Sequence, residues 1–210
     1  MAHQLTPGST RVTVPCVHPL VGRASLIREV DALLRRGQSV LLVGPEGIGK
    51  TAVIGALERP EIVIVDPLAH MSSQRAAALR RAMDRGSVLL AAARTLDRGE
   101  LGCVGRVLWR FRVVRVRPLA ASSVARLVRL ALSRHGEAGL PMPRDWIAHA
   151  VDAASGMPGR ALAIVDVACA RWRERQQLLP PRLALVIAMQ NALIGSETPQ
   201  AGVEPGEPSS

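Results

Sequence analysis

The chain has 210 residues, a length that accommodates one α/β domain with a small appendage but not two large domains. Hydrophobic residues make up 48% of the sequence and aromatic residues only 2%, so the core is expected to be aliphatic and rich in alanine. The net charge of +10 makes nucleic acid a candidate partner, although solvated arginines on helix surfaces would give the same excess.

The three cysteines are odd in number and far apart in the sequence: Cys16, Cys103 and Cys169. This spacing fits neither a disulfide framework nor a zinc site and favours a reducing compartment. The first residues lack a signal-peptide pattern, and no apolar run approaches the ~18 residues that a membrane span needs. We therefore expect a cytoplasmic protein without membrane association.

The first half of the chain predicts alternating helices and strands after a polar, turn-rich arm over residues 1–17. Helical periodicity or capping signals predict helices over residues 24–36, 50–57, 72–84 and 100–109. Short apolar runs predict buried strands over residues 39–43, 61–66, 88–93 and 111–116. Strands that alternate with helices indicate an α/β fold with a parallel, doubly wound sheet.

From residue 118 onward the pattern is helical. Ser122 or Ser123 is expected to cap a helix ending near residue 134, and three more helices are expected over residues 144–154, 159–175 and 182–193. The Pro/Gly/Ser/Glu-rich residues 196–210 are expected to be disordered. This division predicts a nucleotide-binding domain over residues 18–117 and an all-α lid over residues 118–195.

Lys50 is the only lysine in a chain with 26 arginines, and it lies in a complete phosphate-loop pattern, G-x-x-x-x-G-K-[ST]. A compact ammonium on a flexible stem reaches the β/γ-phosphates where a planar guanidinium is too wide. A strand before the loop and a helix after it provide the context that the motif requires. We expect the loop to bind ATP or ADP through Gly44, Pro45, Glu46, Gly47, Ile48, Gly49, Lys50, Thr51 and Ala52.

The loop backbone N–H groups are expected to cradle the β-phosphate, where the following helix dipole also favours anions. Thr51 would bind Mg²⁺ through its hydroxyl, and Asp66, at the end of the next strand, would hold the ion directly or through water. The alternative role of Asp66 is to cap the turn before Pro67.

Taken in order, several motifs resemble those of the AAA+ ATPases, especially the STAND-type ATPases (NB-ARC proteins and large LuxR-type regulators) and the Orc/Cdc6 group. The resemblance covers about residues 18 to 175. It implies an adenine-side motif, a Walker B strand, a sensor 1 strand, a link to the lid and a lid motif with a sensor 2 arginine. Leu20-Val21-Gly22-Arg23 resembles the adenine-side motif, and residues 62–66, ending at Asp66, resemble the Walker B strand. Residues 89–95, with Arg94, resemble the sensor 1 strand, and residues 114–119 resemble the link to the lid. Residues 156–162, with Pro158 and Arg160, resemble the lid motif and its sensor 2 arginine.

The sequence departs from the family pattern at two points. Only 15 positions separate Thr51 from Asp66, so we expect the family's edge strand to be missing and the sheet to have about four strands. The alternative is that residues 62–66 are that edge strand. Pro67 follows Asp66 where hydrolytic members carry a glutamate, so any ATPase activity is expected to be weak.

Several arginines have two readings each. Arg160 would contact the γ-phosphate or remain an exposed helix residue, and Arg94 would sense phosphate or pair with an acid. Arg110, with Arg106 as the competitor, lies where AAA+ rings place an arginine that acts on a neighbouring subunit. His70 would assist a water or cap a helix. Asp66, Arg110 and Arg94 are thus the candidate catalytic residues.

Three functions remain open at this point. The first is a nucleotide-dependent switch, whose lid controls self-association or a protein partner. The second is a DNA-associated AAA+ ATPase that binds duplex through arginine-rich surfaces. The third is a non-hydrolysing module that binds nucleotide for stability.

Overall fold

A computed structural model describes residues 20–57, 59–68, 71–135, 143, 145–175 and 178–196. The expectations for the N-terminal arm, Cys16, His70 and residues 197–210 fall outside these residues. Among the described helices, none has the length and apolar character required to cross a membrane.

The centre of the fold is a four-stranded parallel sheet in the order β2-β3-β1-β4. Its strands are β1 (Val40–Val43), β2 (Ile62–Val65), β3 (Val88–Ala93) and β4 (Arg112–Arg115). Every residue of β1 is buried, as expected for a strand covered on both faces. The parallel four-stranded sheet predicted from the sequence is confirmed, and β2 lies at one edge of it.

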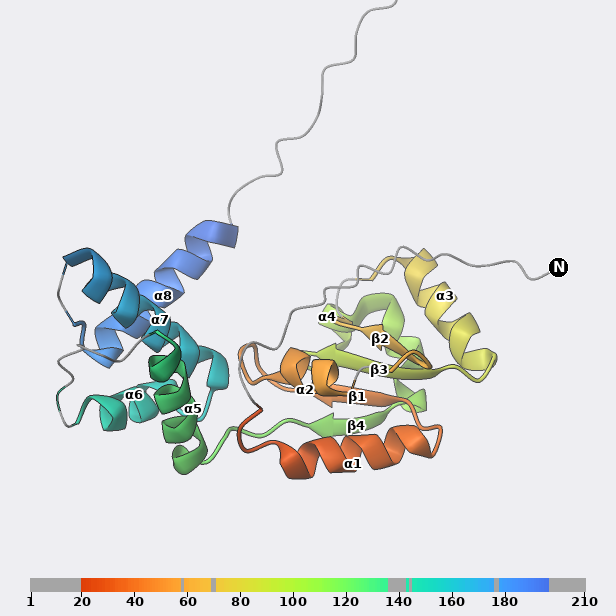
Figure 1. The fold of residues 1–210 in the computed structure, drawn as a ribbon. Coiled ribbons are helices and arrows are strands. Elements are labelled where there is room, and N and C mark those ends of the chain that lie inside the picture. Colours follow the sequence, from red (N-terminus) through yellow and green to blue (C-terminus); the bar gives the residue numbers. More distant parts are fainter. Residues whose placement is uncertain are drawn as a thin grey trace, which may run out of the picture.

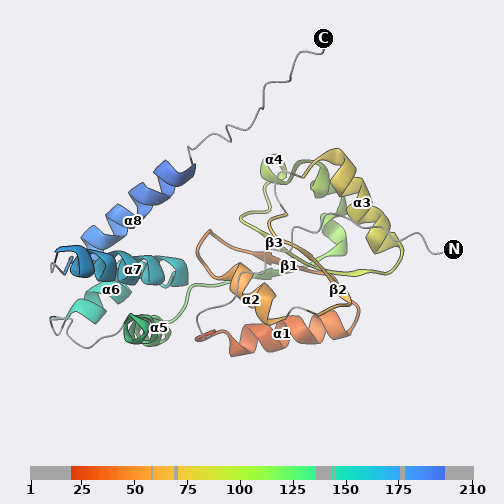
Figure 2. The same cartoon turned by 45° about the horizontal axis from the view of Figure 1, so that its top comes forward.

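Helices cover both faces of the sheet (Figures 1 and 2). The side chains of Val40 and Leu42 pack with α1 (Ala24–Arg35) and α2 (Lys50–Ala56). Leu41 and Val43, on the opposite face, pack with α3 (Ser73–Asp84), α4 (Arg98–Leu101) and a 3₁₀ helix, η1 (Gly102–Arg110). The alternation of side chains along β1 thus divides the core into two layers.

Two local predictions were wrong. The helix expected over residues 100–109 is instead the short α4 followed by η1, and Gly102 takes a positive φ of 48° at the change. Ser122 and Ser123 do not cap α5 (Ala121–Arg134), because the helix begins before them with Ala120 at its N-cap. By contrast, of the two serines expected as alternative caps of α3, Ser72 takes the role: its hydroxyl accepts a hydrogen bond from the Arg75 amide at 3.3 Å, and Ser73 is the first residue of the helix.

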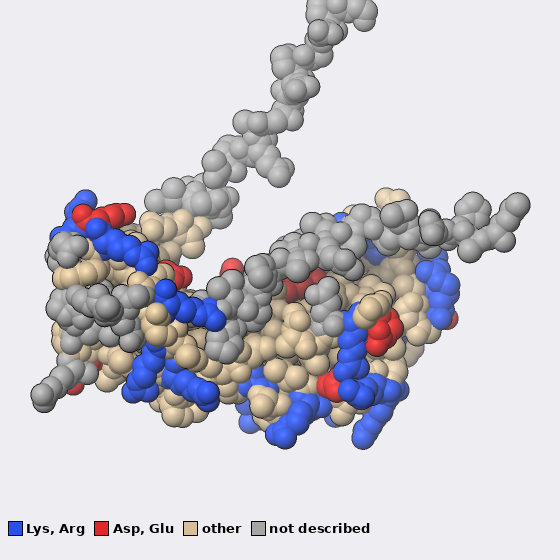
Figure 3. Space-filling view, in the orientation of Figure 1, with Lys and Arg blue, Asp and Glu red and all other residues tan. Residues whose placement is uncertain are grey.

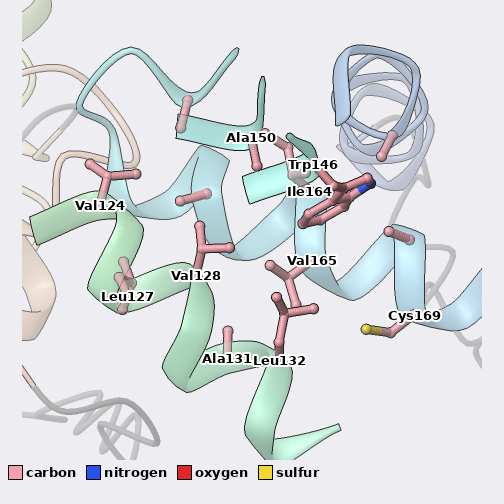
Figure 4. Close-up of a cluster of buried hydrophobic side chains, with 14 of the residues drawn as sticks. Val124, Leu127, Val128, Ala131, Leu132, Trp146, Ala150, Ile164, Val165 and Cys169 are labelled. Carbon is pink, nitrogen blue, oxygen red and sulfur yellow. The ribbon is translucent and has the colours of Figure 1, made fainter. Parts of the chain in front are cut away.

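The C-terminal part contains α5, α6 (Trp146–Ala154), α7 (Pro158–Arg175) and α8 (Pro181–Ser196). Their aliphatic side chains enclose a core of their own, separate from the sheet (Figure 4). Trp146 is 3% exposed within it, and its Nε1 donates to the Leu179 carbonyl at 2.9 Å, so the indole is a hydrogen-bonded core residue. This helical part lies beside the ends of the strands that carry the phosphate loop (Figure 1).

Candidate nucleotide-binding site

The loop between β1 and α2 contains two residues in the left-handed backbone conformation, and both are glycines. Gly47 and Gly49 take positive φ angles of 75° and 93°, and Gly49 is the N-cap of α2. The buried Gly44 amide donates to the Ala93 carbonyl at the end of β3, at 3.3 Å. Ile48 is fully buried, so the middle of the loop is anchored in the core below it.

Lys50 folds back over this loop. Its Nζ donates to the carbonyls of Gly44 and Pro45 at 2.7 and 2.9 Å. Burial lowers the pKa of the Lys50 ammonium, while the negative charges of Asp66 and Glu46 act in the opposite direction. The cation is therefore held at the mouth of the loop by backbone oxygens and two nearby acids.

Thr51 and Asp66 come together at the start of α2 and the end of β2. The Thr51 hydroxyl donates to Asp66 Oδ2 at 2.7 Å, although 15 positions separate the two residues. A hydroxyl oxygen beside a carboxylate is a suitable pair of oxygen ligands for Mg²⁺. Pro67, the next residue, is exposed and has no group able to accept a proton.

The first turn of α7 packs directly on the phosphate loop. The Gly159 amide donates to the Gly47 carbonyl at 2.8 Å. A Cβ added to Gly159 would lie only 2.8 Å from the Gly47 Cα, so the two backbones touch with no room for a side chain. Pro158 borders the same loop, since a Cβ on Gly49 would lie 3.8 Å from its Cγ.

Arg23 joins the loop to the connection between sheet and helices. Its guanidinium donates through Nη2 to the Ile48 carbonyl at 2.7 Å and through Nη1 to the Arg117 carbonyl at 2.6 Å. The residue is 6% exposed, its Nε is buried without a partner, and burial lowers its pKa. The side chain predicted to lie on the adenine side is thus held by backbone carbonyls of the loop and of the link.

The two residues before Arg23 contact the helical part. Val21 packs against the core formed by α5 to α8. Gly22 has a φ of 70°, and a Cβ on it would lie 2.6 Å from the Ser123 hydroxyl in α5. The predicted motif therefore sits where the loop, the link and the helical part meet.

The remaining predicted residues lie farther out. Arg160 is exposed in the first turn of α7, one residue after Gly159, and Arg94 is exposed just after β3. Arg110 forms an ion pair with Asp84 of α3 and lies 5.1 Å from the centroid of the Trp109 ring. The structure therefore brings Arg160 near the loop and holds Arg110 against its own chain.

Two contacts of the site were missed by the sequence reasoning. The Gly47–Gly159 contact had a visible signal, because Gly156-Met157-Pro158-Gly159 was singled out as a motif turn. The partners of Arg23 are backbone carbonyls, and because every residue has one, the sequence does not show which of them Arg23 contacts.

No family model matches the chain, and no curated protein matches it either. Solved structures with a similar fold include S. cerevisiae Hsp104 in complex with casein, with a TM-score of 0.61 and 18% identity over 76% of this chain. They also include a Thermotoga maritima RuvB variant, with a TM-score of 0.53 and 14% identity over 81% of this chain, RuvB being a Holliday junction branch migration motor. A katanin structure concerned with self-assembly has a TM-score of 0.51 and 15% identity over 88% of this chain.

These matches cover 39% of the Hsp104 chain, 70% of the RuvB chain and 85% of the katanin chain. All three neighbours are AAA+ ATPases, so the chain has the fold of an AAA+ module. At these identities the likeness concerns the fold alone.

Proposed function

We propose that the chain is an ATP- and Mg²⁺-binding switch module of the AAA+ type. In this proposal residues 118–195 form a lid that responds to the nucleotide and controls self-association or a protein partner. The observation that carries it is the contact between Gly47 and Gly159, because the loop that is the candidate phosphate site also contacts the first turn of α7. A ligand on one side of that loop can change the lid on the other only if it favours one of two arrangements.

The residues of the loop have the chemistry that a nucleoside triphosphate needs. The backbone N–H groups of residues 47–51 hold the β-phosphate, and the Lys50 ammonium exchanges two carbonyl acceptors for phosphate oxygens. Thr51 and Asp66 hold the metal ion, with the hydroxyl and carboxylate already 2.7 Å apart. When bound, Mg²⁺ neutralises charge on the β- and γ-phosphates.

The lid senses the nucleotide through α7. Arg160 is placed one residue beyond the Gly159 contact, so its long side chain can extend over the loop toward a γ-phosphate. Arg23 adds a second link, since it donates both to the loop and to the backbone that leads into the lid. Nucleotide binding and the position of the lid are therefore coupled through the Gly159 contact and through the two hydrogen bonds of Arg23.

Hydrolysis is weak or depends on a partner. Asp66 is engaged with Thr51 and serves the metal, and the next residue is a proline. A carboxylate able to orient the attacking water must then come from elsewhere, such as a second subunit or a protein partner. This feature suits a switch that dwells in its ATP state.

The direct test is titration calorimetry of ATP with Mg²⁺ against the wild type and Lys50→Ala. The variant should lose detectable binding, and Lys50→Arg should bind more weakly because its fork does not fit the loop. Arg175→Ala, an exposed residue at the far end of α7, is the control and should bind normally. Unchanged affinity in a folded Lys50→Ala protein would refute the nucleotide site.

A second candidate is a DNA-associated ATPase, and the distribution of arginine favours it. Residues 101–135 contain eight arginines and no acidic residue. Binding to duplex that weakens steeply with salt would support this candidate over a purely protein-directed switch. The third candidate, a non-hydrolysing module, requires that no turnover be measurable under any condition.

A further inference from the structure

The positive charge of the chain is concentrated in one segment. Residues 101–135 carry eight arginines and no Asp or Glu, whereas the other 175 residues carry 19 basic and 17 acidic residues. Eight of the ten net positive charges thus belong to the segment that contains η1, β4, the link after β4 and α5. The excess of arginine over acid is largely confined to residues 101–135, so its explanation must lie in what this segment does.

Five of these arginines form what we call the arginine band: Arg112, Arg115, Arg117, Arg126 and Arg129. All five are exposed, and none forms an ion pair with another residue of the described part of the chain. Other surface arginines do find acids, as Arg35 does with Asp31 and Arg182 with Asp152. Within the described residues, therefore, no acid neutralises the charges of the band.

The band lies on two elements that the fold leaves open. β4 is an edge strand, paired only with β1, and three of the arginines lie on it or just after it. Arg126 and Arg129 lie on the solvent face of α5, opposite the buried Val124, Leu127 and Val128. Figure 3 shows basic side chains on the lower side of the molecule, below α5 and near α1, with acidic side chains among those near α1.

We propose that the arginine band binds the phosphate backbone of nucleic acid and spans the link between the sheet and the helical part. Guanidinium groups bind phosphate in bidentate fashion, and a row of them matches a ligand with repeated negative charge. Side chains alternate along a strand, so Arg115 and Arg117 project from one face of β4 and Arg112 from the other, and all three can reach a ligand only at the open edge of the strand. Along that edge Arg112 to Arg117 span about 16 Å, at about 3.3 Å per residue, which is several phosphates of a duplex.

The composition of the band favours nucleic acid over an acidic protein. Protein interfaces bury a core depleted in charge and enriched in aromatic and apolar side chains. On β4 and α5 the only large hydrophobic residue that is exposed is Val113, at 37%. The exposed Trp109, at 78%, lies in η1 against Arg110 and outside the band. The band itself offers arginines and no large apolar anchor, which suits a phosphate backbone.

The position of the band has a consequence for the switch, and this step rests on the proposed function. A duplex that contacts both β4 and α5 bridges the link over residues 116–120 and favours one position of the lid. The nucleotide and the duplex then bias the same element from opposite sides. Their effects on each other's affinity must be equal, because coupling between two ligands is reciprocal.

The test is fluorescence anisotropy of a labelled duplex of about 30 base pairs with the full chain over a salt series. One double variant removes charge from the strand, Arg112→Gln with Arg115→Gln, and another from the helix, Arg126→Gln with Arg129→Gln. The matched control is Arg80→Gln with Arg81→Gln, two exposed arginines of α3 outside the band. All three remove the same charge.

Each band variant should weaken binding at least about fivefold and reduce the salt slope by about 1–2, while the control changes affinity less than about twofold. Equal weakening by all three variants, or no binding by the wild type at low salt, would overturn the proposal. An effect of the helix variant alone would overturn the bridging of the link. Poly-glutamate of matched charge that binds as tightly, through the same arginines, would assign the band to an acidic protein instead.

The nucleotide function is tested separately in the same assay. Lys50→Ala should bind duplex like the wild type without nucleotide, because Lys50 lies outside the band. A wild type that binds duplex through the band but binds no ATP would refute the switch and leave the band in place. Band variants that bind duplex normally, in a protein that binds ATP, would refute the band alone.

Discussion

The backbone amide of Gly159 donates to the carbonyl of Gly47 at 2.8 Å, so the first turn of α7 rests on the phosphate loop itself. Gly159 has no space for a side chain facing the loop, since a Cβ there would meet the Gly47 Cα at 2.8 Å and the Gly47 carbonyl oxygen at 3.0 Å, whereas a Cβ on Gly47 would lie 3.7 Å from the Gly159 Cα. Contacts this close do not adjust gradually, because packed backbones have few alternative arrangements. A shift of the loop must therefore move α7 or break the contact.

Replacing Gly159 with alanine should break that contact. The added methyl overlaps the loop backbone, and overpacking of this kind costs about 1–3 kcal/mol of stability. Gly55→Ala is the matched control, because a Cβ there meets nothing within 4 Å and alanine is favoured in the interior of α2. Urea unfolding should show a loss for Gly159→Ala and a slight gain for Gly55→Ala. Equal stability of the two variants would mean that the loop does not support α7.

Arg23 should not tolerate lysine. Arg23→Lys keeps a buried positive charge but replaces the planar fork, which reaches the carbonyls of Ile48 and Arg117 through two separate nitrogens, with a single ammonium on a shorter stem, so it should lose about 1.5–3 kcal/mol. Arg23→Met leaves both carbonyls unpaired, and because each unsatisfied buried acceptor costs about 1–3 kcal/mol, it should be the more destabilised of the two. Thermal or urea unfolding at neutral pH ranks them. A lysine variant as stable as the wild type would show that the guanidinium fork is not needed.

The lysine variant also has a predicted pH dependence. Burial, which lowers the pKa of Arg23, would lower the pKa of a lysine at the same place. The folded state then binds fewer protons than the unfolded state between that lowered pKa and the ordinary lysine value, so the free energy of unfolding rises with pH across this window. Arg23→Met should show no such rise.

The phosphate loop and its partners were predictable because they depend on residue identity. A sole lysine within a complete motif marks the loop, and Asp66 at the end of an apolar strand marks the candidate metal site. The 2.7 Å hydrogen bond from Thr51 to Asp66 is possible because β1 and β2 run parallel in one sheet, so the loop and helix after β1 lie at the same edge as the end of β2. Hydrophobic runs likewise predicted all four strands to within one or two residues.

The errors and omissions have other physical causes. Gly102 interrupts the helix that apolar periodicity predicted, because its left-handed backbone separates α4 from η1. Ser122 and Ser123 are good caps in isolation, yet the helix begins at Ala121, where the link delivers the chain. The contacts of Arg23 and Gly159 depend on backbone atoms far apart in sequence, which no local pattern records.

Nucleotide binding should take up protons at alkaline pH. Burial lowers the pKa of Lys50 in the empty loop, and the phosphates of a bound nucleotide would raise it. The bound state then holds more proton than the free state, so ATP affinity falls as pH rises through the pKa of the free protein. Calorimetry in buffers of different ionisation enthalpy measures this uptake. A wild type whose ATP affinity and proton balance are independent of pH up to about 10 would contradict it.

Turnover of the isolated chain should be slow. Pro67 stands where a carboxylate would polarise water, so we expect a kcat well below the typical ~10 s⁻¹. Phosphate release from ATP with Mg²⁺ measures it, and Lys50→Ala sets the background. Fast turnover that disappears in Lys50→Ala would reveal another catalytic base and refute the role given to Pro67.

The last prediction concerns Arg160, which follows the Gly159 contact and is exposed in the first turn of α7. If its guanidinium contacts the γ-phosphate, ATP should protect the helical part from proteolysis more than ADP, because only ATP carries that group. One charge-assisted contact is worth about 1.5–3 kcal/mol, which corresponds to a preference for ATP of about tenfold or more. Arg160→Ala should abolish the preference and leave ADP affinity nearly unchanged, since the loop is intact. Arg175→Ala, on the same helix but far from the loop, should keep it. An Arg160→Ala protein that still distinguishes ATP from ADP like the wild type would leave the lid without its sensor, and the switch would then depend on the Gly47–Gly159 contact alone.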